Sequence, residues 1–101
     1  MSLKEGDDMS GLNYKEGIAN GISEVTMDSL RRYIESGVEP GGFLTAVLEN
    51  RLHESLMRAD ANNLRHIKEI ISWVYWYAPS DCWGSPEEVD EWLAEDNSEV
   101  A

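Results

Sequence analysis

Residues 61–79 read ANNLRHIKEIISWVYWYAP, and this segment indicates the fold class most clearly. Its apolar residues recur at spacings of three and four, which is the pattern of a helix with one apolar face. They are Leu64, Ile67, Ile71, Val74 and Ala78. Asp60 suits the N-cap position, and Pro79 lacks the backbone N–H that would continue the helix. The sequence therefore predicts a helix over about 61–78 with these residues as its apolar seam.

Two further helices are predicted before this one. The first begins at Thr26, whose hydroxyl suits the N-cap, and ends at Gly37, where glycine adopts the left-handed conformation. The second begins in or just after the Pro40-Gly41-Gly42 turn and runs to about Arg58. Its predicted buried stripe consists of Leu44, Val47, Leu48, Leu52, Leu56 and Met57.

A fourth, shorter helix follows a loop. The run Ser85-Pro86-Glu87-Glu88 places serine at the N-cap, proline at the first helical position and glutamate at the third, which is a capping box. Val89, Trp92 and Leu93 give this helix an apolar face, and it ends at about Glu95. No segment alternates as a strand does. The sequence therefore predicts an all-α fold, a small helical bundle of about four helices, two longer and two short.

The predicted boundaries divide the chain into three parts. Residues 1–25 contain four glycines and few large apolar residues, so we expect a flexible N-terminal arm with one weak helical turn near 15–19. Residues 26–95 form the helical domain, and residues 96–101 form an acidic tail.

The charge of the chain is strongly negative and unevenly distributed. Its 101 residues include 8 Lys and Arg and 20 Asp and Glu, which gives a net charge of −12. Residues 81–101 carry acids and no base. Direct nucleic-acid binding is not expected, because it needs Lys and Arg to displace phosphate counterions. The acidic end either keeps the protein soluble or docks on a basic partner, in the manner of DNA phosphates.

Several other classes of protein are not expected. No apolar run reaches the ~18 residues of a membrane span, so we expect no membrane partner and a cytoplasmic location. One cysteine excludes an internal disulfide framework and a four-cysteine zinc site. An HExxH zinc site would need histidine where Met57 stands, and nothing near Cys82 in the sequence lowers its pKa. We therefore expect no enzyme activity, no metal and no cofactor. Cys82 is expected to pack in the interior as a small apolar residue.

Aromatic residues are concentrated between positions 73 and 92. They cover more than half of the circumference of the third helix, so some pack beneath the fourth helix and others reach the surface as interface anchors. Together with the acidic residues of the fourth helix, they suggest a protein-binding surface. The predicted partner-binding residues are Trp76, Trp83, Glu87, Glu88, Asp90, Glu91 and Glu95.

Two alternatives remain open at this point. Gly41 and Gly42 at a helix N-terminus expose backbone amides, and with Arg31 or Arg32 they suggest a site for a phosphate-bearing ligand such as a nucleotide. The same glycines also permit a tight turn that lets Phe43 dock in the core. The second alternative is a structural homo-oligomer, in its simplest form a homo-dimer, held by the tryptophan cluster.

The run from Leu30 to Leu93 resembles a group of small proteins encoded by bacteriophages and prophages. The resembling segments are 31–35 (RRYIE), 40–50 (PGGFLTAVLEN), 58–60 (RAD) with Asn63, 78–80 (APS) and 82–87 (CWGSPE). The resemblance implies a phage origin and the cytoplasm of a bacterial host, and it supplies no mechanism. It favours a non-enzymatic accessory protein that binds a host or phage protein, inhibiting a nucleic-acid-handling or defence enzyme.

Overall fold

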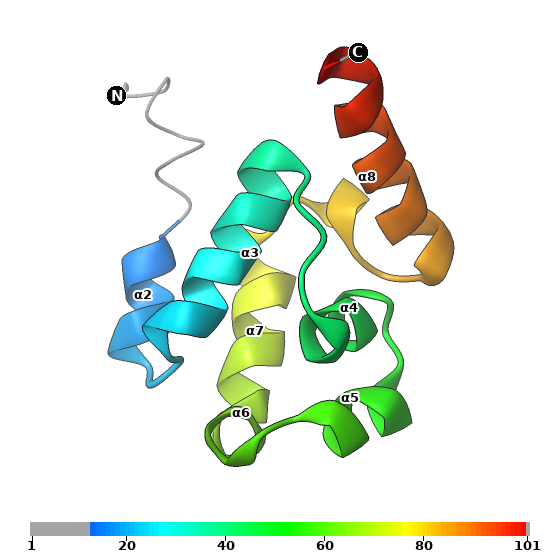
Figure 1. Ribbon diagram of the computed structural model, residues 1–101. Coiled ribbons are helices and arrows are strands. Elements are labelled where there is room, and N and C mark those ends of the chain that lie inside the picture. The colour runs from blue at the N-terminus through cyan, green and yellow to red at the C-terminus, as the bar shows by residue number, and fades with distance from the viewer. Residues whose placement is uncertain (1–12, 101) are drawn as a thin grey trace.

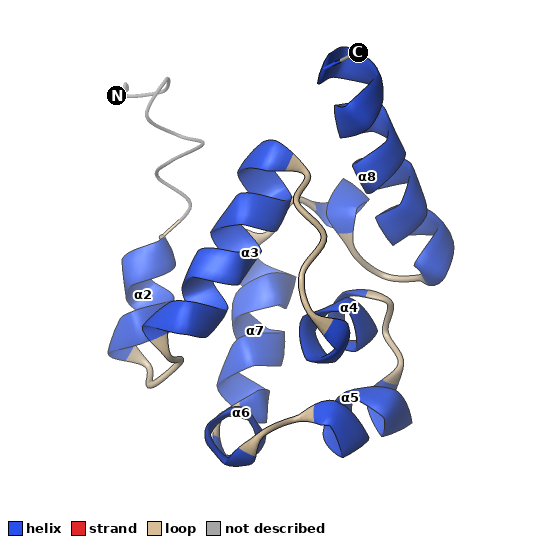
Figure 2. Ribbon diagram, in the orientation of Figure 1, coloured by secondary structure: helices blue, strands red, loops and turns tan. Residues whose placement is uncertain are grey.

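The computed structural model describes residues 13–100, with side chains to residue 94. Within this part of the chain every regular element is helical, so the predicted all-α class is confirmed (Figure 2). The elements are α2 (Tyr14–Ala19), α3 (Glu24–Ser36), α4 (Gly42–Leu48), α5 (Leu52–Arg58), α6 (Ala61–Arg65), α7 (Ile67–Tyr77), the 3-10 turn η1 (Ser80–Cys82) and α8 (Pro86–Val100).

One hydrophobic core joins α3, α4 and α7, which lie together in the middle of the molecule (Figure 1). Leu30 and Tyr33 of α3, Leu48 of α4 and Ile70 of α7 have no exposed surface. α2 packs against α3 and α7 on one side, and α8 packs against η1 and α4 on the other. None of the described helices has both the length and the apolar character needed to cross a membrane.

The packed region begins earlier than predicted. Residues 14–19 form α2, Gly17 is buried, and Ile22 is only 2% exposed. An alanine Cβ at Gly17 would lie 2.6 Å from the Met27 sulfur, so glycine permits the close approach of α2 to α3. The helical turn predicted near residues 15–19 is therefore present as α2, but the predicted flexibility is wrong for residues 13–25 because they pack on the core. Residues 1–12 of the predicted arm lie outside the described part of the chain.

Aromatic packing and hydrogen bonds attach α2 to α7. The Tyr14 ring stacks on Trp73 with centroids 5.3 Å apart, and the Trp73 indole N–H donates to the Asn13 carbonyl oxygen at 2.9 Å. The Tyr14 hydroxyl is buried and faces the Glu35 carboxylate without forming an aligned hydrogen bond. Burial first, and the Glu35 charge second, raise the pKa of Tyr14 above its ordinary value of 10.0.

The first predicted helix begins three residues early. Ser23 is the N-cap of α3, because its hydroxyl accepts the Thr26 amide hydrogen bond at 3.1 Å. Thr26 is instead buried, and its hydroxyl donates to the Asn63 side-chain oxygen at 2.9 Å. Gly37 follows α3 with φ of 65°, so the predicted glycine stop is confirmed.

The second predicted helix is divided in two. After α4, Asn50 adopts the left-handed conformation with φ of 64°. The Arg51 amide donates to the Ala46 carbonyl oxygen at 2.9 Å, as in a Schellman cap with asparagine in place of the usual glycine. This turn redirects α5, so Leu52 and Met57 of the predicted buried stripe are 64% and 71% exposed.

The third predicted helix is also interrupted. His66, with φ of −114°, separates α6 from α7. Asp60 caps α6 as predicted, because its carboxylate accepts the Asn63 amide hydrogen bond at 2.7 Å. α7 ends at Tyr77, before the predicted proline stop at Pro79.

The predicted seam of the third helix is correct in part, because Val74 and Ala78 are buried as expected. Ile70, Trp73 and Val74 are at most 2% exposed, whereas Leu64 and Ile71 lie at the surface. The reason is α2, which covers Trp73 and draws that side of α7 into the core. The prediction left α2 out of the packed domain and therefore missed the burial of Ile70 and Trp73.

The predicted start of the fourth helix is confirmed. The Ser85 hydroxyl accepts the Glu88 amide hydrogen bond at 3.2 Å at the N-terminus of α8. The helix continues to Val100, beyond the predicted end near residue 95. The segment expected to form a separate acidic tail is therefore helical over residues 96–100.

Candidate functional site

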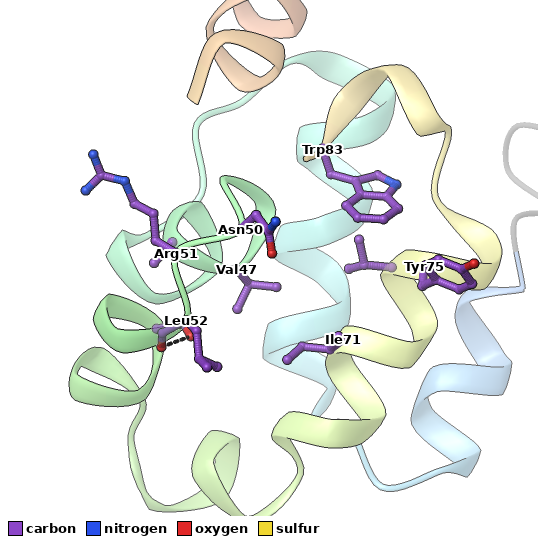
Figure 3. Close-up of a pocket in the computed structure, with 10 residues that line it drawn as sticks. Val47, Asn50, Arg51, Leu52, Ile71, Tyr75 and Trp83 are labelled. Carbon is purple, nitrogen blue, oxygen red and sulfur yellow. Dashed lines mark hydrogen bonds between the residues drawn. The ribbon is translucent and has the colours of Figure 1, made fainter. Parts of the chain in front are cut away.

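A pocket opens between α4, α5, α7 and the segment that follows η1 (Figure 3). Val47, Leu52, Ile71, Tyr75 and Trp83 supply most of its apolar lining. The pocket encloses about 90 Å³. Sites for whole small molecules are typically about 300–1,000 Å³, so this pocket has room for one apolar side chain and not for a nucleotide.

The Trp83 wall of the pocket is held by the backbone around it. The Gly84 amide donates to the Leu48 carbonyl oxygen at 2.7 Å, which ties the segment after η1 to the end of α4. The Trp83 ring meets Tyr75 edge-on with centroids 6.0 Å apart. Its indole N–H is buried and has no acceptor among the described residues, so packing alone fixes the ring.

The polar groups of the pocket rim are already engaged. The Ser55 hydroxyl donates to the Leu52 carbonyl oxygen at 2.7 Å. The Arg51 guanidinium turns away from the pocket and pairs with Glu49 at 3.2 Å (Figure 3). The lining therefore offers apolar contact, with no acid and base placed to transfer a proton across it.

Helix α8 carries an acidic face beside this region. Val89 is 1% exposed, and the Trp92 indole N–H donates to the Tyr33 carbonyl oxygen at 3.0 Å. These contacts hold the apolar side of α8 on the core. Glu87, Asp90 and Glu91 are exposed on the helix, with no ion pair to any cation of the described residues; their positions at i, i+3 and i+4 share one face.

The remaining predicted partner-binding residues occupy different places. Glu88 is half-buried at the start of α8, and the side chain of Glu95 lies outside the described region. Trp83 is half-buried in the pocket wall. Trp76 is 73% exposed and lies on the opposite edge of α7, where it lines a separate hollow. The structure therefore separates Trp76 from the pocket that contains Trp83.

The predicted phosphate site is not assembled as expected. Arg31 and Arg32 both bond to Asp28 on the surface of α3, and these bonds, Arg32 first, lower the pKa of Asp28. The side chain nearest Gly42 is that of Arg58, which itself pairs with Glu54 at 3.0 Å. α4 is only seven residues long, so its dipole offers little to an anion.

The histidines and the cysteine show no catalytic grouping in the described structure. No three ligand-type side chains of residues 13–94 lie close enough to hold a metal. The His66 ring lies against Gly21, and its Nδ1 lies 3.1 Å from the Asn62 carbonyl oxygen. Cys82 is fully buried, so its predicted packing is confirmed.

The sequence indicated the acidic face of α8 and missed the pocket. Four elements form the pocket, and the left-handed Asn50 that separates two of them was the only local signal for it. Comparison with protein-family models, curated proteins and solved structures found no match for this chain.

Proposed function

We propose that this chain is a phage-type accessory protein that binds a basic host or phage protein and has no catalytic activity of its own. The observation that carries the proposal is the acidic face of α8, where Glu87, Asp90 and Glu91 are exposed and unpaired within the described structure. A concentrated negative surface accelerates association with a positively charged partner and favours its correct orientation.

The anchoring of α8 supports this role. A flexible acidic tail would lose conformational entropy on binding, whereas a helix already fixed by Val89 and Trp92 loses less. The rigid helix also fixes the spacing of the three carboxylates. A partner with matching lysines or arginines is then preferred over one with the same total charge.

The pocket supplies an apolar anchor site for the same partner. Trp83 in the pocket wall precedes the α8 N-cap residue Ser85 by two positions, so the pocket and the acidic helix are neighbours in the fold. Binding energy at protein interfaces is concentrated in a few apolar or aromatic side chains that fill such pockets. One apolar side chain of the partner enters here while its basic residues meet α8.

Nucleic-acid-handling and defence enzymes are the proposed class of target. These enzymes present channels lined with Lys and Arg to phosphate groups, and a rigid row of carboxylates competes for the same channel. A phage origin, which residues 30–93 imply by resemblance alone, is part of this proposal and places the target in a bacterial host.

The test compares two triple variants with equal loss of charge. Glu87→Gln, Asp90→Asn and Glu91→Gln remove the acidic face, whereas Glu16→Gln, Glu24→Gln and Glu39→Gln remove three exposed acids elsewhere. Both variants are used to capture proteins from a bacterial extract. We expect the α8 variant to retain roughly a tenth or less of the partner retained by the control. Equal retention by the two variants would contradict the proposal.

A further inference from the structure

The outer edge of α7 forms a second surface, distinct from the pocket. Lys68, Ser72 and Trp76 are spaced four residues apart and are all exposed, with Trp76 at 73%. A hollow of about 170 Å³ lies beside them, bordered on the far side by Asn20 after α2. Within the described residues the Trp76 indole is only partly covered. Its neighbour Tyr75 meets it edge-on, with ring centroids 5.0 Å apart.

We propose that a second copy of this chain docks on this edge, with the two α7 helices antiparallel and related by a two-fold axis near Ser72. A two-fold contact is reciprocal, so the residue four positions before the axis meets the residue four positions after it in the other copy. Lys68 of each copy therefore lies over Trp76 of the other. This places an ammonium group on an indole face, which is a favourable cation–π pairing.

The shape of the edge suits this arrangement. Ser72 at the crossing point is small, so the helices can reach the interaxial distance of about 8–10 Å that packed helices adopt. The hollow is lined by Lys68 and also by Trp76, so the indole of one copy enters the hollow of the other at its Lys68 end. The same surface thus provides both the protruding side chain and the space that receives it.

Charge also favours a second copy at this place. The chain has a net charge of −12, so most contacts between two copies are repulsive. α7 itself carries one base, Lys68, and one acid, Glu69, and is neutral. The unpaired acids of α8 lie on a helix that packs against η1 and α4. A neutral helix offers a basic partner little electrostatic attraction. It also offers a second acidic copy little repulsion, so a second copy is the occupant that this surface favours.

The size of the surface implies a weak, reversible dimer. A fully buried aromatic side chain contributes about 150–250 Å², so Trp76 offers roughly 110–180 Å² at its exposed fraction of 73%, with Lys68 and Ser72 beside it. Stable interfaces bury about 800 Å² on each partner. The contact is much smaller than that, so we expect half-dissociation only at roughly hundreds of micromolar to millimolar concentrations.

Sedimentation velocity over micromolar to millimolar concentrations tests the dimer. We expect the wild type to shift from monomer to dimer and Trp76→Lys, which opposes two lysines, to dimerise at least about tenfold more weakly. Adding Lys68→Glu to Trp76→Lys replaces that repulsion with an ion pair and restores dimerisation. A wild type that stays monomeric, or a double variant that is not restored, would overturn the proposal. Circular dichroism confirms that each variant is folded.

Cysteine cross-linking tests the position of the axis. Ser72→Cys places two thiols next to each other in the dimer, and Cys82 does not interfere because it is fully buried. The control is Val25→Cys on α3, where the native side chain is 77% exposed. With oxidised glutathione, Ser72→Cys forms disulfide-linked dimers faster than the control. Equal or slower cross-linking at position 72 would contradict the two-fold axis.

Salt separates this inference from the proposed function, on which it does not depend. Added salt screens the repulsion between two copies of charge −12 and strengthens the dimer. The same salt weakens the contact of the α8 acids with a basic partner. If the chain dimerises but binds no basic partner, the proposed function is refuted and the dimer is not. If it binds a basic partner but does not dimerise, the dimer is refuted and the proposed function is not.

Discussion

At the scale of single residues, burial determines the chemistry of Cys82. Its side chain has no exposed surface, and the Tyr33 hydroxyl donates to its carbonyl oxygen at 2.8 Å. Desolvation by burial raises the pKa of the Cys82 thiol from 9.0 to about 12. The thiol is therefore protonated at neutral pH and packs in the core, while the backbone carbonyl of Cys82 accepts the bond that attaches η1 to α3.

This pKa predicts a loss of stability in alkaline solution. The unfolded thiol releases its proton near 9.0, while the folded thiol keeps it to about 12. The folded state binds more protons in this interval, so the free energy of unfolding falls as pH rises through it. Urea titrations measure the free energy of unfolding at each pH. Between pH 9.0 and about 12 we expect this free energy to fall by on the order of a few kcal/mol more in the wild type than in Cys82→Ala. Parallel losses in both proteins would refute this role of Cys82.

Most local caps were predictable from the sequence, whereas the Ser23 cap, three residues before the predicted Thr26, and one left-handed residue were not. Gly37, Asp60 and Ser85 end or begin helices as predicted, because each effect involves only the few residues beside it. Asn50 takes the same conformation as Gly37, yet an apolar stripe continues past it in the sequence. Asparagine tolerates φ above zero less easily than glycine, so the stripe suggested a continuous helix.

At the scale of helices, α2 depends on one glycine. Gly17 lies against Met27 and Trp73, both of which are about 2% exposed and have little room to move. The Cβ of an alanine there would lie 2.6 Å from the Met27 sulfur and 3.2 Å from Trp73 Cδ1. Close packing at this position therefore outweighs the higher helix propensity of alanine.

We expect Gly17→Ala to lower the free energy of unfolding by about 1–3 kcal/mol in urea denaturation. The matched control is Gly41→Ala, because nothing lies within 4 Å of its Cβ and its φ of −68° suits any residue. The control should cost at most about 1 kcal/mol, because its only effect is that alanine is a poorer N-cap for α4 than glycine. Greater stability of Gly17→Ala than of the wild type would show that α2 does not pack closely on α3.

Helical periodicity predicted which segments are helical better than it predicted their buried faces. The stripe that ends in Leu52 and Met57 was expected in the core, but the turn at Asn50 leaves these residues exposed. On α7 the core side is set by α2, which covers Trp73. The buried face of a helix depends on its neighbours, and a single segment does not specify them.

At the scale of the whole molecule, the fold separates two kinds of surface. α8 presents unpaired acids, and the outer edge of α7 is neutral and aromatic. The sequence indicated the acids of α8 because the end of the chain contains no base to neutralise them. The pocket at Trp83 and the hollow at Trp76 could not be predicted, since each requires elements that are distant in the sequence.

Native mass spectrometry of the protein isolated from bacterial cells tests the central claim, that α8 binds a basic protein, most directly. We predict a species containing this 11.4 kDa chain and one polypeptide rich in lysine and arginine, which dissociates as ionic strength is raised. Recovery of the chain alone, or carrying only a phosphate-sized mass, would contradict that claim.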